Sequence, residues 1–308
     1  MHVHLSRRAA LKTLLGAATL AGMSTLHAAD GSSAFLTRAI PASGEKIPAV
    51  GLGTWQTFDV GRSSSDRAPL KEVLRTFVER GGRAIDSSPM YGNAEGVAGD
   101  LAQELGVQDK LFVATKVWTS GRAAGIKQME ESFKLLRVAR IDLMQVHNLL
   151  DLDVHMKTLR EWKSAGRIRY IGITHYHAGA HDELARLVKT REYQFAQFNY
   201  SAGEREAEAR LLPACADSGT AVLVNRPFAE GALFRKVRGK PLPDWAGEFD
   251  CASWAQFFLK YIVSHPAVTC AIPTTSNPQH LADNMQAGLG RLPDEKTRRR
   301  MVEYLESV

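Results

Sequence analysis

The chain has few cysteines and no apolar run long enough to span a membrane. Its three cysteines, Cys215, Cys251 and Cys270, are odd in number and far apart in the 308 residues, unlike the closely spaced, even set of a disulfide scaffold. Cys270 lies in an apolar stretch, which predicts that it belongs to the core. The apolar segment near the N-terminus, LLGAATLAGM, is too short to cross a bilayer. A disulfide framework is therefore excluded, and we expect no stable membrane anchor.

A large excess of charge of one sign is also missing. The formal net charge of +6 comes from 39 basic and 33 acidic residues. Arg7, Arg8 and Lys12 lie in a segment that we assign below to an export signal, and without them the net charge is +3. This value is too small to indicate nucleic-acid binding. The basic run at residues 298–300 is predicted to form a solvated helix face.

Residues 1–29 have the pattern of an export signal. Paired arginines in SRRAALK precede the short apolar stretch, and the small residues of LHAAD follow it. Ser6, Arg7, Arg8, Leu11 and Lys12 stand where a twin-arginine signal has its characteristic residues. We therefore expect the twin-arginine machinery to be a partner of this segment and the mature protein to be periplasmic. The folded part is then a single domain over residues 30–308.

Apolar runs of strand length recur eight times along the chain, separated by stretches with helical periodicity. The runs cover residues 49–55, 83–88, 111–116, 141–147, 168–174, 195–201, 221–227 and 268–274. Near-continuous apolar strands that alternate with helices favour a parallel sheet covered on both faces. The glycine-rich turn of a doubly wound sheet is missing after the first strand. The sequence therefore predicts an α/β fold, a (β/α)8 TIM barrel.

Two further elements are expected at the ends of this barrel. The segment LTRAIPASGEKIPAV precedes the first strand and predicts a hairpin that turns at Ser43-Gly44 and covers the barrel floor. The C-terminal LPDEKTRRRMVEYLESV predicts an extra helix after the eighth.

Polar residues follow three of the predicted strands at the ends where barrel enzymes carry their chemistry. Asp86 and Tyr91 follow the second strand, Lys116 ends the third and His147 ends the fourth. Each of them alone has a structural explanation, such as a turn cap or a packed ring. Because the carboxyl ends of parallel strands meet at one rim, the four together predict a catalytic site.

The motifs of the chain resemble those of the aldo-keto reductases over residues 35–308. The stretches IPAVGLGTW, AIDSSPMYGNAE, VATKVW, DLMQVH, IGIT, QFNYS and IPTTSNPQHLADN occur in that family's order and spacing. The resemblance implies NAD(P)H-dependent reduction of an aldehyde or ketone, with Asp86, Tyr91, Lys116 and His147 as the catalytic residues. Chemistry agrees, since a phenol beside an ammonium can give up a proton more easily, and a carboxylate keeps that ammonium charged.

The resemblance also implies where the cofactor binds. Gln197 and Thr174 stand where the family contacts the nicotinamide, whereas His175 replaces a common asparagine, and Arg226 or Phe228 would stack on the ring. Asn277 and Pro278 predict the start of a helix whose amides face an anion. The adenosine end would then be bound by Thr274, Thr275, Ser276, His280 and Asn284. Thr274 and His280 replace the family's usual lysine or arginine, so we expect a modest preference for NADPH, with NADH possible.

Aromatic residues near the predicted rim suggest the kind of substrate. Trp55 and Trp118 are expected to wall the substrate pocket, which suits an apolar or aromatic carbonyl compound.

Two other functions remain open from the residues alone. A metal-dependent barrel hydrolase also uses Asp, Lys and His at strand ends, and a cofactor-binding sensor would lack turnover. The histidines of THYHAGAH, His175, His177 and His181, are spaced as metal ligands could be. They span a strand end and a helix start, where they need not share a face, so we expect no metal.

Overall fold

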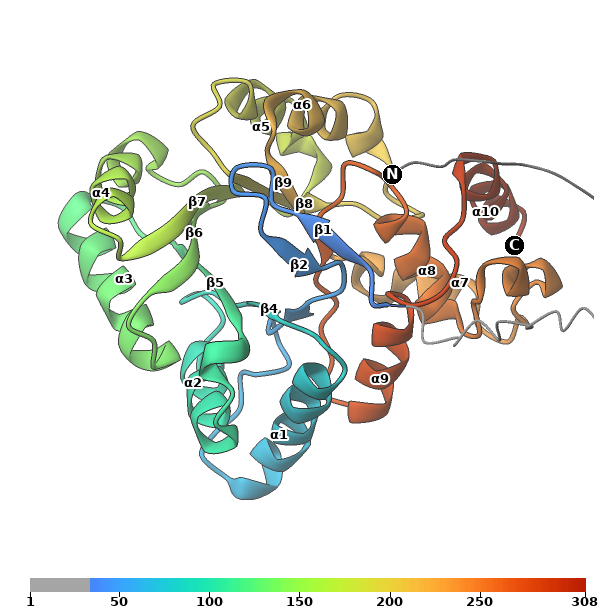
Figure 1. Ribbon diagram of the computed structural model, residues 1–308, viewed down its shortest axis with the longest axis horizontal. Coiled ribbons are helices and arrows are strands. Elements are labelled where there is room, and N and C mark those ends of the chain that lie inside the picture. Colours follow the sequence, from blue (N-terminus) through green and yellow to red (C-terminus); the bar gives the residue numbers. More distant parts are fainter. Residues whose placement is uncertain (1–33) are drawn as a thin grey trace, which may run out of the picture. The chain divides into compact units, whose positions relative to one another are not determined.

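Eight parallel strands form a barrel in the part of the chain that the structure, a computed structural model, describes, residues 34–308 (Figure 1). Their order in the sheet follows the chain: β3 (Leu52–Gly53), β4 (Ala84–Asp86), β5 (Phe112–Val117), β6 (Ile141–His147), β7 (Ile168–Thr174), β8 (Phe195–Asn199), β9 (Ala221–Asn225) and β10 (Cys270–Ala271). Parallel bridges from Val50 to Ala271 and from Gly53 to Thr274 join the first strand to the last. The predicted barrel is confirmed. The export signal predicted for residues 1–29 lies outside the described residues.

Helices surround the strands on the outside of the barrel (Figure 1). They are α1 (Ser64–Glu79), α2 (Ala94–Leu105), α3 (Arg122–Leu136), α4 (Leu152–Ser164), α5 (His181–Val188), α6 (Leu211–Ser218), α7 (Ala232–Lys236), α8 (Trp254–Val263), α9 (Pro278–Gln286) and α10 (Glu295–Ser307). The short α7 belongs to the long connection between β9 and α8, and α10 is the predicted extra helix. No helix within residues 34–308 combines the length and apolarity that a membrane crossing requires.

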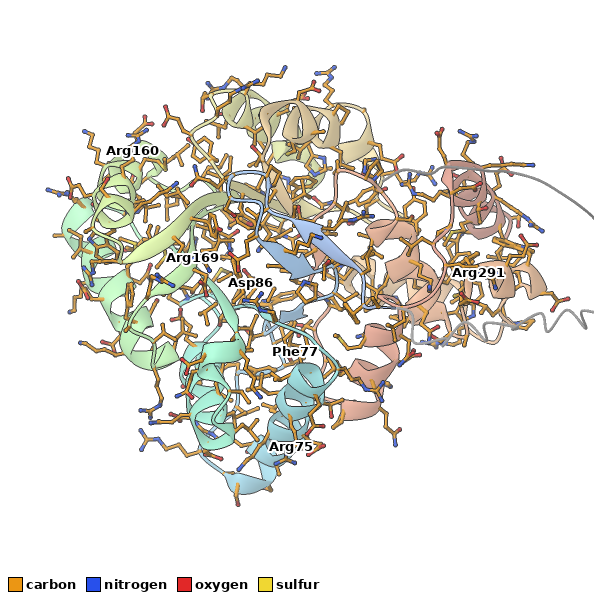
Figure 2. All side chains as sticks on the ribbon, viewed as in Figure 1. Arg75, Phe77, Asp86, Arg160, Arg169 and Arg291 are labelled. Atoms are coloured by element: carbon orange, nitrogen blue, oxygen red, sulfur yellow. The ribbon has the colours of Figure 1, made fainter. Side chains whose placement is uncertain are left out.

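The apolar core has two layers because each strand points side chains alternately into and out of the barrel. The outer layer fills the space between strands and helices and includes Phe77 of α1. The inner layer fills the barrel near the start of the strands, where the rings of Phe112, Tyr170 and Phe195 lie with centroids 5.4–6.0 Å apart. Charged side chains such as Arg75 and Arg160 project from the outer helices, while Asp86 lies near the centre (Figure 2).

The predicted hairpin closes the floor of the barrel. Strands β1 (Thr37–Ala39) and β2 (Lys46–Pro48) pair antiparallel, and their turn is fixed by a bond from the Gly44 amide to the Ile40 carbonyl oxygen (2.8 Å). Gly44 has a φ of +74°, which glycine adopts without strain. Ile40 and Ile47 are fully buried in the inner layer. The hairpin therefore seals the end at which the strands begin.

The extra helix corrects one expectation about the basic run at residues 298–300. Arg299 and Arg300 are exposed as predicted, but the side chain of Arg298 is only 12% exposed and pairs with Glu208 at 2.7 Å. It also donates to the Tyr200 hydroxyl and lies 4.6 Å from the Tyr261 ring centroid. The reason is helical periodicity, since residue 298 shares a face with the buried residues at 301 and 305.

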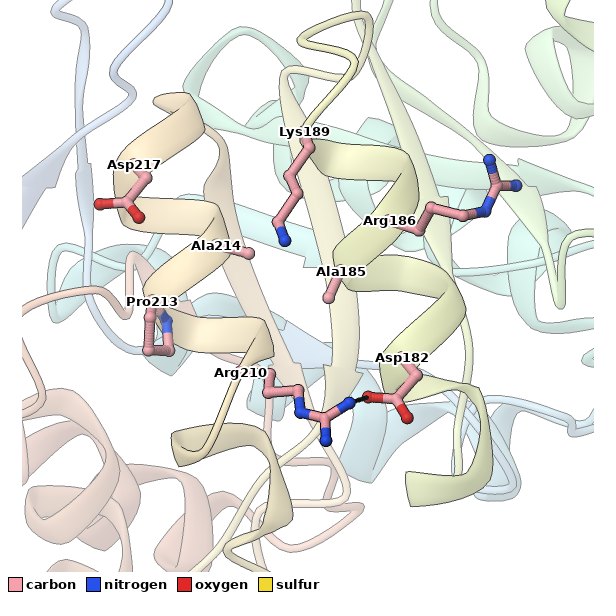
Figure 3. Close-up of a pocket in the computed structure, with 8 residues that line it drawn as sticks. All are labelled: Asp182, Ala185, Arg186, Lys189, Arg210, Pro213, Ala214 and Asp217. Atoms are coloured by element: carbon pink, nitrogen blue, oxygen red, sulfur yellow. Dashed lines mark hydrogen bonds and ion pairs between the residues drawn. The ribbon is translucent and has the colours of Figure 1, made fainter.

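The cysteines and one groove on the outer surface complete this description. All three cysteines are free and buried, and Cys270 lies in the inner layer as predicted. A groove of about 410 Å³ lies between α5 and α6, where Lys189 points into it and Arg210 pairs with Asp182 across it (Figure 3). No residue predicted to take part in chemistry lines this groove, so the functional site must be sought at the rim.

Candidate active site

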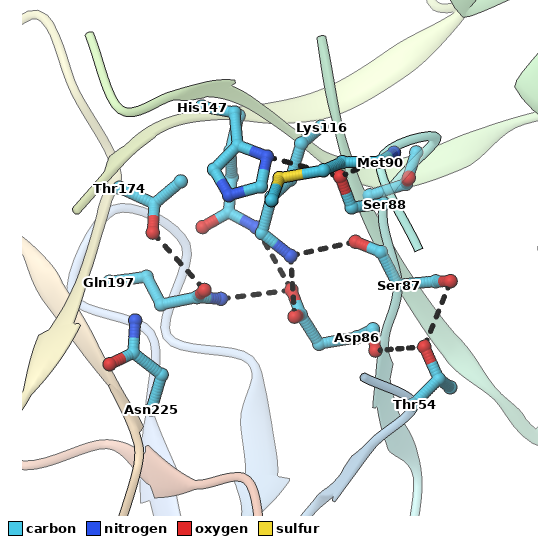
Figure 4. Close-up of polar contacts among 12 residues, drawn as sticks. Thr54, Asp86, Ser87, Ser88, Met90, Lys116, His147, Thr174, Gln197 and Asn225 are labelled. Atoms are coloured by element: carbon cyan, nitrogen blue, oxygen red, sulfur yellow. Dashed lines mark hydrogen bonds and ion pairs between the residues drawn. The ribbon is translucent and has the colours of Figure 1, made fainter. Parts of the chain in front are cut away.

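A buried ion pair lies at the carboxyl ends of β4 and β5. The Nζ atom of Lys116 is 2.6 Å from Oδ2 of Asp86 and 2.7 Å from the carbonyl oxygen of Ser87 (Figure 4). The Lys116 side chain is fully buried and that of Asp86 is 4% exposed. Burial lowers the pKa of Lys116, but the negative charge of Asp86, with further interactions with Asp86 and Tyr91, outweighs burial and raises the pKa overall. Lys116 is therefore an ammonium held in a dry site by its carboxylate.

Two amides hold the other carboxylate oxygen of Asp86. Gln145 and Gln197 donate to Oδ1 at 3.1 Å and 2.9 Å, and Thr174 donates to Oε1 of Gln197 at 3.1 Å. The Gln145 side chain has room in this position because its neighbour on β7 is Gly172. A Cβ atom at residue 172 would lie only 2.9 Å from Gln145 Cγ. Both oxygens of Asp86 are thus satisfied, as a buried charge requires. A continuous chain of hydrogen bonds runs from Thr174 to Lys116.

Tyr91 lies beside this ion pair. Its ring centroid is 5.0 Å from Lys116 Nζ and 6.0 Å from the His147 ring, edge to face. Burial raises the pKa of the Tyr91 phenol, while the positive charge of Lys116 opposes that rise. The phenol is accordingly protonated at neutral pH, next to a cation that would stabilise the phenolate left after proton transfer.

His147 lies on the same rim, at the end of β6. Burial and the nearby Lys116 charge lower its pKa from 6.5 to about 3, so the imidazole is neutral near pH 7. Its Nδ1 atom is 3.1 Å from the hydroxyl of Ser88. A neutral imidazole has one N–H donor and one acceptor nitrogen. His147 can therefore donate a hydrogen bond to a substrate oxygen without bringing a charge.

Exposed apolar side chains gather around this rim. Met90, Trp118, Tyr176 and Phe234 follow β4, β5, β7 and β9, and each is 38–49% exposed. The Trp118 ring centroid lies 6.2 Å from that of His147. Trp55 is half-buried beside β3, and its carbonyl oxygen accepts from Thr274 at 3.3 Å. The structure therefore places Trp118 next to the catalytic candidates and links Trp55 to the segment after β10.

The residues expected at the nicotinamide end differ in how many of their hydrogen-bonding groups already have partners in the protein. Thr174 and Gln197 are engaged in the Asp86 network. His175 Nδ1 accepts from the Tyr176 amide at 3.0 Å, and its carbonyl oxygen accepts from Asn225 Nδ2 at 3.1 Å. Asn225 Oδ1 is buried and has no hydrogen-bond partner within residues 34–308. This side chain at the end of β9 is a free acceptor beside Gln197 (Figure 4).

Arg226 and Phe228 follow β9 and are held by contacts of their own. Arg226 donates to the Tyr176 carbonyl oxygen at 2.9 Å and lies 3.3 Å from the Glu230 carboxylate. Phe228 packs on Phe234, with ring centroids 4.8 Å apart.

The segment after β10 forms the predicted helix start. The Asn277 side chain accepts from the Gln279 amide at 2.8 Å, and Pro278 is the first residue of α9. Thr275 Oγ1 accepts from the Asn277 amide at 3.0 Å, and Thr274 Oγ1 lies 2.7 Å from Thr57 Oγ1. Ser276 and His280 are exposed and Asn284 is buried. At the start of α9, Ser276 and His280 are therefore exposed to solvent, at the helix terminus whose dipole favours an anion.

The histidines after β7 do not converge on a common point. His175 and His177 have ring centroids 4.3 Å apart, but His181 is directed to Asn199, with Nε2 2.9 Å from Oδ1. Within the described residues, no group of three or more His, Cys, Asp or Glu side chains is arranged to hold a metal ion.

Three residues of the site had no predicted role. They are Gln145, which holds Asp86; Ser88, which contacts His147; and Asn225, with its free acceptor. The signal for Gln145 was present, because it precedes His147 by two residues on one strand and so must share its face. Ser88 and Asn225 give no such signal, since serine and asparagine at strand ends are common in turns.

The fold and the site together define a (β/α)8 barrel that carries a buried Lys–Asp pair beside a tyrosine and a histidine at the ends of its strands. The sequence model of the aldo/keto reductase family matches residues 49–300. The chain is 28% identical over 246 residues to methylglyoxal reductase YeaE of Escherichia coli strain K12, covering 77% of this chain and 84% of that protein. It is 25% identical over 293 residues to NADP-dependent D-sorbitol-6-phosphate dehydrogenase of Malus domestica, covering 82% and 89%.

A solved structure has the same fold. The aldo-keto reductase of Klebsiella pneumoniae, crystallised in complex with NADPH, superposes with a TM-score of 0.74 at 23% identity and covers 88% of this chain and 95% of its own. This protein therefore belongs to the aldo/keto reductase family.

Proposed function

We propose that the protein reduces an aldehyde or ketone to the alcohol, with NADPH as the preferred cofactor and NADH as a weaker one. The observation that carries the proposal is the buried Lys116–Asp86 pair beside Tyr91, at the rim of a barrel of this family. Family membership favours a reductase over a metal-dependent hydrolase. Turnover would distinguish it from a cofactor-binding sensor.

The residues at the rim fit a nicotinamide cofactor. Asn225 Oδ1 is a buried acceptor without a partner in the described chain, and it suits a carboxamide N–H. Thr174, His175 and Gln197 surround the same position. Thr275, Ser276 and His280 lie at the start of α9, and Asn284 lies further along this helix. When bound there, the cofactor supplies the hydride.

Tyr91 supplies the proton in the proposed mechanism. Its phenol stays protonated until the substrate oxygen gains negative charge, and it then transfers the O–H proton to that oxygen. The Lys116 ammonium stabilises the phenolate that remains, and Asp86 keeps Lys116 charged and in place. His147 donates a hydrogen bond to the same substrate oxygen, which orients the carbonyl and disperses its charge.

The exposed apolar side chains at the rim indicate the substrate class. Met90, Trp118 and Tyr176 offer contact area but no charge to a substrate, and Arg226 is already engaged with Glu230 and the Tyr176 carbonyl oxygen. We therefore propose an uncharged carbonyl compound with an apolar or aromatic arm. A small dicarbonyl such as methylglyoxal, named for one relative, is the contrasting candidate.

The test follows NADPH absorbance with purified protein and a panel of aromatic aldehydes, ketones, quinones and methylglyoxal. We expect steady oxidation of NADPH with the apolar compounds and a higher kcat/KM for them than for methylglyoxal. Substitution of Tyr91 by Phe serves as the control for contaminating reductases. The absence of turnover with every compound, in protein that binds NADPH, would support the sensor instead.

The preference for NADPH is proposed to be modest. The start of α9 offers the extra phosphate the helix dipole and the exposed Ser276 and His280, but no lysine or arginine. His280→Arg should increase the ratio of NADH to NADPH Kd by roughly 3- to 10-fold, between the values for an exposed ion pair and for a hydrogen bond to a charged group. The gain should fade at high salt. Equal affinity of the unmodified protein for the two cofactors would contradict the preference.

We also propose that the protein is exported folded by the twin-arginine route, through residues 1–29. The support is the SRRAALK segment together with a fold that would acquire its cofactor in the cytoplasm. Changing Arg7 and Arg8 together to Lys should leave the full-length protein in the cytoplasmic fraction. Unchanged delivery to the periplasm would count against this route.

A further inference from the structure

Ser88 contacts the Nδ1 atom of His147. Within residues 34–308, the other ring nitrogen, Nε2, has no hydrogen-bond partner. The Ser88 hydroxyl oxygen and His147 Nδ1 are 3.1 Å apart, and Ser88 is fully buried (Figure 4). Family membership does not assign this contact a purpose, and neither does the proton transfer described above. It nevertheless decides what His147 can offer to a substrate.

The direction of this hydrogen bond follows from the other contact of Ser88. The Met90 amide donates to the same hydroxyl oxygen at 3.2 Å, so Ser88 already serves there as acceptor. If Nδ1 also donated to it, the hydroxyl proton would be left without an acceptor in a fully buried place. Buried polar groups of this kind are almost always paired. Both the oxygen and the proton of the Ser88 hydroxyl are paired when it donates to Nδ1, which is then the acceptor nitrogen.

We propose that Ser88 is a positioning residue that holds His147 in the tautomer with its proton on Nε2. Nε2 has no hydrogen-bond partner within the described chain, so its N–H is free to reach a carbonyl oxygen. The opposite tautomer would direct a lone pair of electrons at that oxygen and repel it. This inference rests on the proposed function, because the substrate oxygen is the intended acceptor.

The tautomer can be measured directly, without substrate or cofactor. Long-range ¹H–¹⁵N correlation NMR of the ¹⁵N-histidine-labelled protein at pH 7 separates protonated from unprotonated ring nitrogens. The His147 signals are identified by their loss in His147→Gln. We expect an unprotonated Nδ1 and a protonated Nε2 in the unmodified protein. A protonated Nδ1 would overturn the proposal whatever the enzyme's activity.

Two substitutions separate the hydrogen bond from the volume of the side chain. Ser88→Ala removes the donor, and Ser88→Cys keeps a similar volume but offers only a weak donor. We expect Ser88→Ala to show a mixture of tautomers and to lose about 2- to 10-fold in kcat, the range that one neutral hydrogen bond can bias. Ser88→Cys should lie between it and the unmodified protein, and NADPH Kd should not change in either.

A matched control is available in Ser132→Ala, which removes another buried hydroxyl, on α3. It should leave both kcat and the His147 spectrum unchanged. Ser88→Ala with an unmixed Nε2–H tautomer would overturn the role of Ser88, even if kcat fell. An unmodified protein with the expected tautomer but no turnover would instead count against the proposed function alone.

Discussion

Tyr91 is the residue whose removal tests the proposed chemistry most directly. Tyr91→Phe keeps the ring, and so most of the packing against His147, but removes the proton that is transferred. We expect kcat to fall by about 10²–10⁴-fold, because general acid catalysis is lost. Cofactor Kd, measured by fluorescence titration, should hardly change. A variant with near-normal kcat would remove Tyr91 from this role and leave His147 as the next candidate acid.

Lys116 should act through the same step. Lys116→Met removes the charge that stabilises the phenolate. Tyr91 then stays in place but can no longer release its proton readily. We expect the double variant Tyr91→Phe, Lys116→Met to be little slower than Tyr91→Phe alone. Losses that multiplied in the double variant would mean that the two residues contribute independently.

His147 makes stability depend on pH in a defined direction. Its pKa of about 3 in the folded protein is below its ordinary 6.5, so the unfolded chain takes up the proton first as the pH falls. The stability due to the neutral ring is full above pH 6.5 and is lost between pH 6.5 and pH 3. From pH 7 to pH 5 the loss is about 2 kcal/mol.

Urea unfolding at these two pH values checks this expectation. The loss in the free energy of unfolding between pH 7 and pH 5 should be smaller in His147→Gln by about 2 kcal/mol. An identical loss in the two proteins would show that His147 is not the group responsible.

At the level of secondary structure, the hairpin of β1 and β2 should matter for stability and not for catalysis. Ile47→Ala removes a fully buried side chain from the inner layer and should cost about 2–5 kcal/mol in urea unfolding. Thr37→Ala, an exposed change on the same hairpin, should stay within about 0.5 kcal/mol. The kcat of folded Ile47→Ala should be unchanged, because the site lies at the other end of the barrel. A large fall in kcat would contradict this separation.

The strands differ in how well the sequence predicted them. The bounds of β6 and β7 agree with the apolar runs at 141–147 and 168–174, since both are long and flanked by clear turns. The runs at 49–55 and 268–274 contain only the short β3 and β10, because pairing across the closure of the barrel is limited to isolated bridges. Such closure depends on the whole sheet and cannot be found in a local pattern.

The site was predictable where side chains carry recognisable chemistry. Asp86, Tyr91, Lys116 and His147 could be selected because their residue types and strand-end positions agree. Gln145 could have been placed on the face of His147 from the strand alternation, but its contact with Asp86, like that of Ser88 with His147, depends on side-chain directions in the folded barrel. The role of Gly172 could not be predicted for a different reason. Because it has no side chain, it leaves the space that Gln145 occupies.

At the level of the whole molecule, Arg298 links the C-terminal helix to the barrel through its contacts with Glu208 and Tyr261. Arg298→Met leaves the Glu208 carboxylate without its cation, and we expect a loss of about 1–3 kcal/mol in urea unfolding, between the values for exposed and buried pairs. Hydrogen exchange should increase in α10. Arg299→Met on the same helix is the control, because this side chain is 63% exposed, and it should have little effect. Equal losses in the two variants would exclude a special role for Arg298.

The sealed floor of the barrel restricts the route by which protons can reach Tyr91 in the proposed enzyme. Ile40, Ile47 and the rings of the inner layer fill the barrel below the Lys116–Asp86 pair. Each proton that Tyr91 delivers must therefore be replaced from the solvent at the rim, through the same opening that admits the substrate and the cofactor. While substrate or product and the cofactor fill that opening, solvent cannot return a proton to the Tyr91 phenolate. Each catalytic cycle would thus be limited to one proton until the product leaves.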